Sequence, residues 1–66
     1  HAVIFRRVYI GENSVVKDSI IMEGSYVGNH CVVQNAILDK NVVLSDGKQV
    51  IGTLEEPIII KKGTVI

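Results

Sequence analysis

Aliphatic residues recur about every six positions along the chain, and the complete pattern returns every seventeen residues. A shift of seventeen places Ile4 on Ile21 and Ile21 on Leu38. Successive segments of six, six and five residues open at aliphatic positions, namely Ile4, Ile10, Val16, Ile21, Val27, Val33, Leu38 and Leu44. Self-similarity at a fixed period is typical of proteins that stack one structural unit. The aliphatic residues return too often for the 3.6-residue period of a helix, so the pattern predicts strands.

Each segment places turn-forming residues after its aliphatic opening. Residues 10–15 and 27–32 are the clearest copies, and residues 16–20 and 33–37 are shortened ones. Gly, Asn and Asp collect where the chain must turn, because they tolerate a positive φ or bond to their own backbone. The sequence therefore predicts an all-β solenoid with short strands and three corners in each 17-residue coil.

The period weakens near the end of the chain. Residues 53–57 break the register, because Pro57 cannot donate a hydrogen bond to a central strand ladder. Strand character returns at residues 58–60, and residues 60–65 form a last six-residue segment that Ile66 closes. We expect one β-helix domain over residues 1–66, with regular coils over 4–52, a loop over 53–57 and a terminal coil over 58–66.

The repeat also separates inward from outward positions. The predicted inner set is Ile4, Val8, Ile10, Ser14, Val16, Ser19, Ile21, Ser25, Val27, Cys31, Val33, Ala36, Leu38, Val42 and Leu44. The predicted outer column is Tyr9, Val15, Ile20, Tyr26, Val32, Ile37 and Val43. Exposed apolar surface of this extent is typical of an interface, although β-propensity alone also selects Val and Ile on strand faces. We favour packing of the outer column against another domain or subunit.

The chain contains more apolar residues than a domain of its size can easily bury. Val and Ile together number 21 of 66 residues, and 47% of the chain is hydrophobic. A chain this short buries only about 60% of the surface that its unfolded form exposes. These numbers suggest a β-rich fragment of a larger protein.

Seven basic and seven acidic residues give zero net charge, which argues against nucleic-acid or membrane binding. One cysteine, Cys31, offers no internal disulfide, and we expect a cytoplasmic protein.

Candidates for chemistry are few. His30 is the only internal histidine that could act as a general base, and a solvated corner is its simpler interpretation. Cys31 aligns with Ser14, which favours a small buried side chain over a reactive thiol. The only basic doublets are Arg6-Arg7 and Lys61-Lys62. They are candidates for holding a phosphorylated effector, with solvated corners as the alternative. We expect no cofactor or metal site, because no zinc ligand set or phosphate-cradling loop is present.

The hexapeptide repeat resembles that of left-handed parallel β-helices, and the handedness is implied by this resemblance. The 6-6-5 order, with Asp-Ser-Ile-Ile-Met-Glu at 18–23 and Asn-Ala-Ile-Leu-Asp-Lys at 35–40, resembles the solenoid of sugar-nucleotide pyrophosphorylases. From residue 13 to residue 66 the chain resembles the C-terminal domain of glucose-1-phosphate adenylyltransferases. Its ending, residues 50–52 and 57–66, resembles most the companion glycogen-biosynthesis subunit of Gram-positive bacteria.

The resemblance implies a parent nucleotidyltransferase that uses Mg²⁺ to form ADP-glucose and pyrophosphate from ATP and glucose 1-phosphate. Its catalytic residues would lie in an N-terminal domain outside this chain, so none is assigned here. The solenoid would contact that domain and other pyrophosphorylase subunits in a homo- or hetero-oligomer, and it would help to shape an effector site between domains. Arg6, Arg7 and Lys17 would lie in the part nearest the catalytic domain, and the resemblance matches none of them to an effector ligand. The alternative is part of a trimeric hexapeptide-repeat acyltransferase, in which His30 would be the base.

Overall fold

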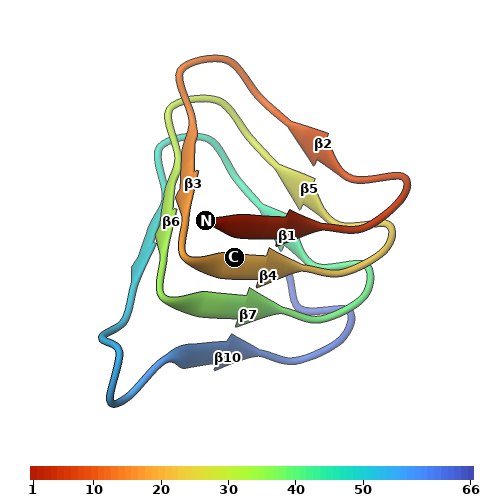
Figure 1. The fold of residues 1–66 in the computed structure, drawn as a ribbon. Coiled ribbons are helices and arrows are strands. Elements are labelled where there is room, and N and C mark those ends of the chain that lie inside the picture. Colours follow the sequence, from red (N-terminus) through yellow and green to blue (C-terminus); the bar gives the residue numbers. More distant parts are fainter.

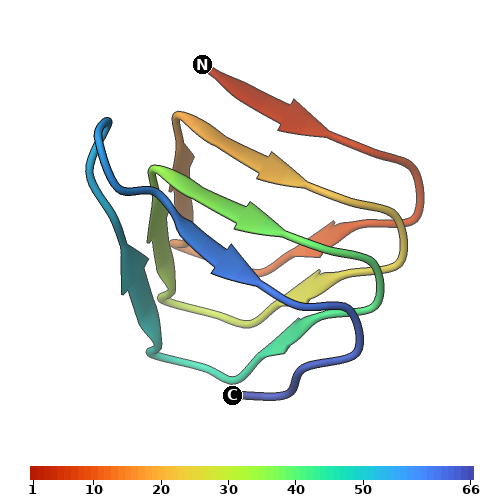
Figure 2. The same cartoon turned by 90° about the horizontal axis from the view of Figure 1, so that it is seen from below.

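The computed structural model describes residues 1–66, which form short parallel strands wound into a triangular prism (Figure 1). The strands are β1 (Ala2–Ile4), β2 (Tyr9–Ile10), β3 (Val15–Lys17), β4 (Ser19–Ile21), β5 (Tyr26–Val27), β6 (Val32–Gln34), β7 (Ala36–Leu38), β8 (Val43–Leu44), β9 (Gln49–Ile51) and β10 (Ile58–Ile60). Figure 2 shows that the two termini lie at opposite ends of the stack of coils. No helix long and apolar enough to cross a membrane is present.

Three parallel sheets form the faces of the prism. Sheet A has the order β1-β4-β7-β10, sheet B has β2-β5-β8, and sheet C has β3-β6-β9. Between neighbouring coils the partners are seventeen residues apart, as in the pairs Tyr9–Tyr26 and Val16–Val33. This register confirms the predicted parallel β-helix with 17-residue coils, and the arrangement of the three sheets is consistent with the left-handed form. Its hand is opposite to that of nearly all other parallel crossover connections.

The register changes once, at the last coil. Ala36 of β7 pairs with Ile58 of β10, which is twenty-two residues later, and an isolated bridge joins Val43 to Val65 at the same spacing. The five additional residues, 53–57, leave the prism between β9 and β10 (Figure 1). The last coil therefore resumes the stack in register.

Left-handed backbone geometry forms the corners of the prism. The non-glycine residues with positive φ are Arg7, Asn13, Asp18, His30, Asn35 and Asn41, and the glycines are Gly24, Gly47 and Gly63. These residues fall into columns along the edges, for example Asn13 (φ 57°), His30 (φ 58°) and Gly47 (φ 75°). Most are Asn, Asp or Gly, which adopt the left-handed region at low cost. The turn chemistry of the sequence thus sets three corners per coil.

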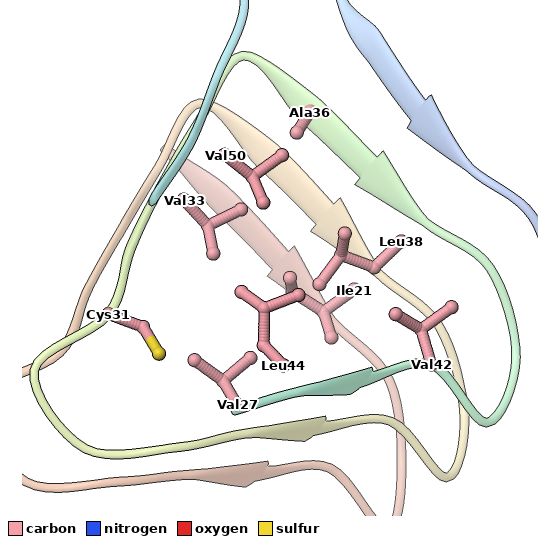
Figure 3. Close-up of a cluster of buried hydrophobic side chains, with 9 residues drawn as sticks. All are labelled: Ile21, Val27, Cys31, Val33, Ala36, Leu38, Val42, Leu44 and Val50. Carbon is pink, nitrogen blue, oxygen red and sulfur yellow. The ribbon is translucent and has the colours of Figure 1, made fainter. Parts of the chain in front are cut away.

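Nine hydrophobic side chains from the three sheets and their corners fill the interior (Figure 3). They are Ile21, Val27, Cys31, Val33, Ala36, Leu38, Val42, Leu44 and Val50. The first coil contributes none of them, because no further coil covers it. Ile4 shares a register position with Ile21 yet is 49% exposed, whereas Ile21 is fully buried. Burial thus depends on a residue's coil as well as on its position within the coil.

Small polar side chains link the coils on the inner side of the corners. The Ser25 hydroxyl donates to the Asp39 carbonyl at 2.8 Å and accepts from the Val42 amide at 3.2 Å. Ser14 makes the equivalent pair of bonds, because it donates to the Gly28 carbonyl and accepts from the Cys31 amide. Ser19 accepts from the Ala36 amide of the next coil but donates to the Lys17 carbonyl within its own coil. Every buried side-chain nitrogen and oxygen has a hydrogen-bond partner. The hydroxyls therefore satisfy buried backbone groups that would otherwise remain unpaired.

Candidate interaction surface

The outer column of apolar residues follows the register of all three sheets. Three of its predicted members are exposed, namely Tyr9 (51%), Val15 (51%) and Tyr26 (43%). The other four are half-buried, namely Ile20, Val32, Ile37 and Val43. On sheet A the column is longer than predicted, because Val3 pairs with Ile20 and Ile59 pairs with Ile37. Val3 and Ile59 are 55% and 64% exposed.

Sequence reasoning missed these two residues for a simple reason. Val3 precedes the first complete segment of the repeat, and Ile59 follows the break at residues 53–57. The sequence did contain a signal for Ile59. Inward and outward side chains alternate along β10, and the five-residue insertion before the strand does not change that alternation. We refer to Val3, Ile20, Ile37 and Ile59 together as the sheet A column.

A groove with a volume of about 330 Å³ lies beside the sheet A column, where residues 53–57 leave the prism. Ile20 and Ile37 line it from the sheet, and Leu54 and Pro57 line it from the loop. The Leu54 side chain is 87% exposed, although it is apolar. The groove and the column together form a continuous apolar surface on one face.

Hydrogen bonds hold the loop in a defined conformation. The Thr53 amide donates to the Glu56 carbonyl at 3.2 Å, and the Glu56 amide donates to Thr53 Oγ1 at 2.9 Å. Asn35 secures the base of the loop, because its carbonyl accepts the Ile58 amide at 3.1 Å and its Nδ2 donates to the Gly52 carbonyl at 3.4 Å. The wall of the groove is thus tied to the body of the prism.

The basic doublets lie at the corner that follows sheet A. Arg6 and Arg7 follow β1, and Arg7 lines a polar hollow of about 380 Å³ with Glu23, Gly24, Lys40 and Asn41. Arg6 and Arg7 are exposed, and neither forms an ion pair with a carboxylate. The one ion pair in the structure joins the N-terminal ammonium to Asp18 at 3.2 Å. Solvent therefore surrounds the two arginines that were considered for effector binding.

His30 and Cys31 occupy adjacent positions with opposite surroundings. His30 is exposed at a left-handed corner and lines neither hollow of the surface. Cys31 is fully buried, and its thiol lies 3.1 Å from the Ser45 carbonyl. No group of three or more His, Cys, Asp or Glu side chains is placed to hold a metal ion. These residues therefore offer no ligand set for Mg²⁺, and we assign them no metal-dependent step.

Comparison with known proteins agrees with this geometry. A family model described as GlmU-like, C-terminal hexapeptide, matches residues 1–65. The chain belongs to this family. A glucose-1-phosphate adenylyltransferase of Corynebacterium diphtheriae is 46% identical to this hexapeptide domain over 56 residues, which are 85% of the chain. The enzyme of the same name from Bacillus cytotoxicus is 38% identical over 48 residues, or 73% of the chain. No solved structure matches.

The hexapeptide domain spans only about an eighth of these relatives, because the matched residues are 13% of each of the two. The resemblance of residues 13–66 to the C-terminal domain of glucose-1-phosphate adenylyltransferases is confirmed at the level of the domain. The relation to a companion subunit of Gram-positive bacteria stays a prediction.

Proposed function

We propose that the chain is the C-terminal structural and regulatory β-helix domain of a glucose-1-phosphate adenylyltransferase subunit, and that it acts through contacts. The observation that carries this proposal is the apolar sheet A column, which runs over all four strands of one face. Such a continuous apolar strip is typical of surfaces that pack against another domain or subunit.

The alternative explanation, that β-propensity alone selects the outer residues, accounts for less of the surface. Propensity favours Val, Ile and Tyr on strands, but it does not place Leu54 on a loop with 87% of its surface exposed. Leu54 belongs to no strand, and its side chain extends the apolar strip beyond the sheet. This extension supports a binding role for the face.

The parent subunit would form ADP-glucose and pyrophosphate from ATP and glucose 1-phosphate with Mg²⁺, as a step of glycogen synthesis in the cytoplasm. In that enzyme the β-helix would hold its own catalytic domain and neighbouring subunits in position. Arg6 and Arg7 would contribute to an effector site formed with another domain. The proposal assigns no catalytic step to the residues described here.

A domain exchange tests the proposal. In the Corynebacterium diphtheriae enzyme, which shares 46% identity over 56 residues, the matched segment is replaced by the corresponding residues of this chain. We expect the chimera to keep the oligomeric state of the parent enzyme and to release pyrophosphate from ATP and glucose 1-phosphate. The same enzyme with the segment deleted should lose both properties.

Two lysine substitutions in the chimera provide a matched comparison. Ile20→Lys places a charge on sheet A, and Val32→Lys places it on sheet C at an equally half-buried outer position of the same coil. We expect at least one of them to reduce both assembly and activity, because burying an unpaired charge in an interface is costly. A chimera that assembles and works equally well with either lysine would overturn the contact role. A chimera as inactive as the deletion would overturn the relation to the enzyme.

A further inference from the structure

Charge is separated between the edges of the prism, although the chain as a whole is neutral. Five of the seven basic residues lie at the corner between sheet A and sheet B, which we call the basic edge. They are Arg6, Arg7, Lys40, Lys61 and Lys62, and all are exposed. The carboxylates at this edge are Glu23 and Asp39, so the net charge of the edge is +3.

The opposite end of sheet A carries the opposite charge. At the corner between sheet C and sheet A, which we call the acidic edge, lie Asp18, Glu55 and Glu56. All three are exposed, and the corner contains no Lys or Arg. The N-terminal ammonium pairs with Asp18 at 3.2 Å, so three negative charges and one positive charge give this edge a net charge of −2. The nearest basic residue along the chain is Lys17, which belongs to β3 of sheet C. The apolar sheet A column therefore lies between a positive and a negative edge.

This arrangement selects one way for two copies to meet. Every strand of sheet A runs from the acidic edge to the basic edge (Figures 1 and 2). A two-fold axis parallel to the strands would place the basic edge of one copy against the basic edge of the other. A two-fold axis parallel to the axis of the solenoid places each basic edge against an acidic edge. Only the second arrangement is electrostatically complementary.

We propose that a second copy of this chain is the partner of sheet A. The two copies pack face to face about a two-fold axis parallel to their solenoid axes, with their sheet A strands antiparallel across the interface. The inference rests on the proposed function as a contact domain and names the partner and the face. Such an interface is isologous, because the same patch is used by both copies.

The size of the face fits a weak dimer. The molecule measures 27 × 22 × 21 Å. One face of such a body offers about 600 Å², so a dimer buries about 1,200 Å² in total, which is the lower limit for specific interfaces. The apolar column supplies the centre of the contact, and the charged edges form its rim. Because rim charges act at long range, they set the orientation of the two copies and the salt dependence of association.

Charge reversal at the two edges tests the arrangement. One variant carries Glu55→Lys and Glu56→Lys, and the other carries Lys61→Glu and Lys62→Glu. Sedimentation velocity should show a dimer of the unmodified chain, and each variant alone should dissociate at least about tenfold more readily, because like charges then meet at both edges. An equimolar mixture of the two variants should recover the dimer as a heterodimer. Raising the salt concentration should weaken the unmodified dimer.

Matched variants separate the face from general effects of charge. Glu12→Lys with Gln49→Lys changes exposed residues away from sheet A and should leave association unchanged. Ile20→Lys should abolish the dimer, and Val32→Lys on sheet C should not. Circular dichroism confirms that each variant keeps its β structure. A monomeric unmodified chain, or a mixture that fails to form the heterodimer, overturns the inference. If the chain is monomeric or the heterodimer fails to form while the chimeric enzyme is still active, the dimer is disproved and the proposed function stands. The two experiments therefore distinguish a failure of the dimer from a failure of the proposed function.

Discussion

The rings of Tyr9 and Tyr26 stack with their centroids 4.9 Å apart and their planes inclined by 14°. The two residues are register partners on β2 and β5, so the parallel strands place one side chain directly above the other. The ring separation is close to the spacing of neighbouring strands, which is about 4.8 Å. Stacked coils thus turn a repeated residue in the sequence into a ladder on the surface.

A double-mutant cycle measures the energy of this ladder. Tyr9→Ala and Tyr26→Ala, alone and combined, should give a stabilising coupling of about 0.5–1.5 kcal/mol from the stacked rings. The free energy of unfolding in urea provides the measurement. A control cycle on Val15 and Val32, which are register partners on sheet C, should give a smaller coupling. Equal couplings would show that the aromatic rings add nothing beyond ordinary cross-strand contact.

Gly28 should be sensitive to the smallest possible substitution. A Cβ atom at this position would lie 2.9 Å from the Leu44 carbonyl oxygen and 2.9 Å from the Asp46 amide nitrogen. These backbone atoms have little freedom to move, because the Gly28 amide donates to that carbonyl at 2.9 Å. We expect Gly28→Ala to cost about 1–3 kcal/mol by overpacking.

The control for this substitution is Ser45→Ala, which lies at the same register position one coil later and already has a Cβ atom. We expect it to change the urea midpoint only slightly, because it removes one hydroxyl and adds no volume. If Gly28→Ala shifts the midpoint no more than Ser45→Ala does, the contact between coils is looser than the structure describes.

The Ser25 hydroxyl should contribute to the stability of the fold. Ser25→Ala removes the acceptor of the Val42 amide and the donor to the Asp39 carbonyl, both on the next coil. Two backbone groups near the core would lose their partner, which we expect to cost about 1–3 kcal/mol of unfolding free energy. Thermal unfolding gives the stability, and hydrogen exchange at the Val42 amide reports the lost bond directly.

Ser25→Cys is the matched variant for this experiment. Cys31 occupies the equivalent inner corner position, and its thiol lies 3.1 Å from the Ser45 carbonyl. This carbonyl is fourteen residues after Cys31, and the Asp39 carbonyl that accepts from Ser25 is likewise fourteen residues after Ser25. A thiol at position 25 should therefore retain part of the stability that alanine loses. Equal losses for Ala and Cys would contradict a role of the side-chain donor.

Deleting residues 53–57 should leave the fold intact. The Gly52 amide donates to the Gln34 carbonyl, and the Ile58 amide donates to the carbonyl of the adjacent Asn35. The two ends of the loop are thus as close as consecutive residues, and direct joining restores the 17-residue spacing. We expect a change within about 1 kcal/mol in unfolding free energy, because closing a loop of only five residues costs little entropy.

Deletion of residues 45–49 is the matched control, because it removes the same number of residues from within a regular coil. It should abolish cooperative unfolding, since the residues after it would lose their register with β6 and β7. Both variants are compared by circular dichroism during urea titration. Loss of cooperative unfolding in the 53–57 deletion would mean that the loop is needed to close the last coil.

The repeat in the sequence predicted much of the core. Ile21, Val27, Val33, Leu38 and Leu44 open five of the predicted segments, and each is fully buried. The pattern works because only inward positions of a short strand must be apolar, and the corners between them must turn. The pattern overestimated the burial of Ile4, which is half exposed at the open end of the stack. It also left Val50 outside the inner set, although Val50 pairs with Val33 and is 95% buried.

The candidate surface was only partly visible in the sequence. Seven members of the outer column were identified, but Val3, Ile59 and the groove beside Leu54 were not. In the sequence alone, nothing relates the doublet Arg6-Arg7 to the doublet Lys61-Lys62. Their positions along one edge depend on the spacing of twenty-two residues between register partners in the last coil, which the seventeen-residue period does not give.

By itself the sequence determined the unit of this protein: a coil of seventeen residues with three short strands, three corners and alternating inward and outward side chains. These features follow from local chemistry, namely side-chain alternation on strands and the turn preferences of Gly, Asn and Asp. Only the tertiary structure decided which residues share an edge or a face. Stacking brings together residues seventeen or twenty-two positions apart, and it is this stacking that collects the basic doublets at one end of sheet A and Glu55 and Glu56 at the other.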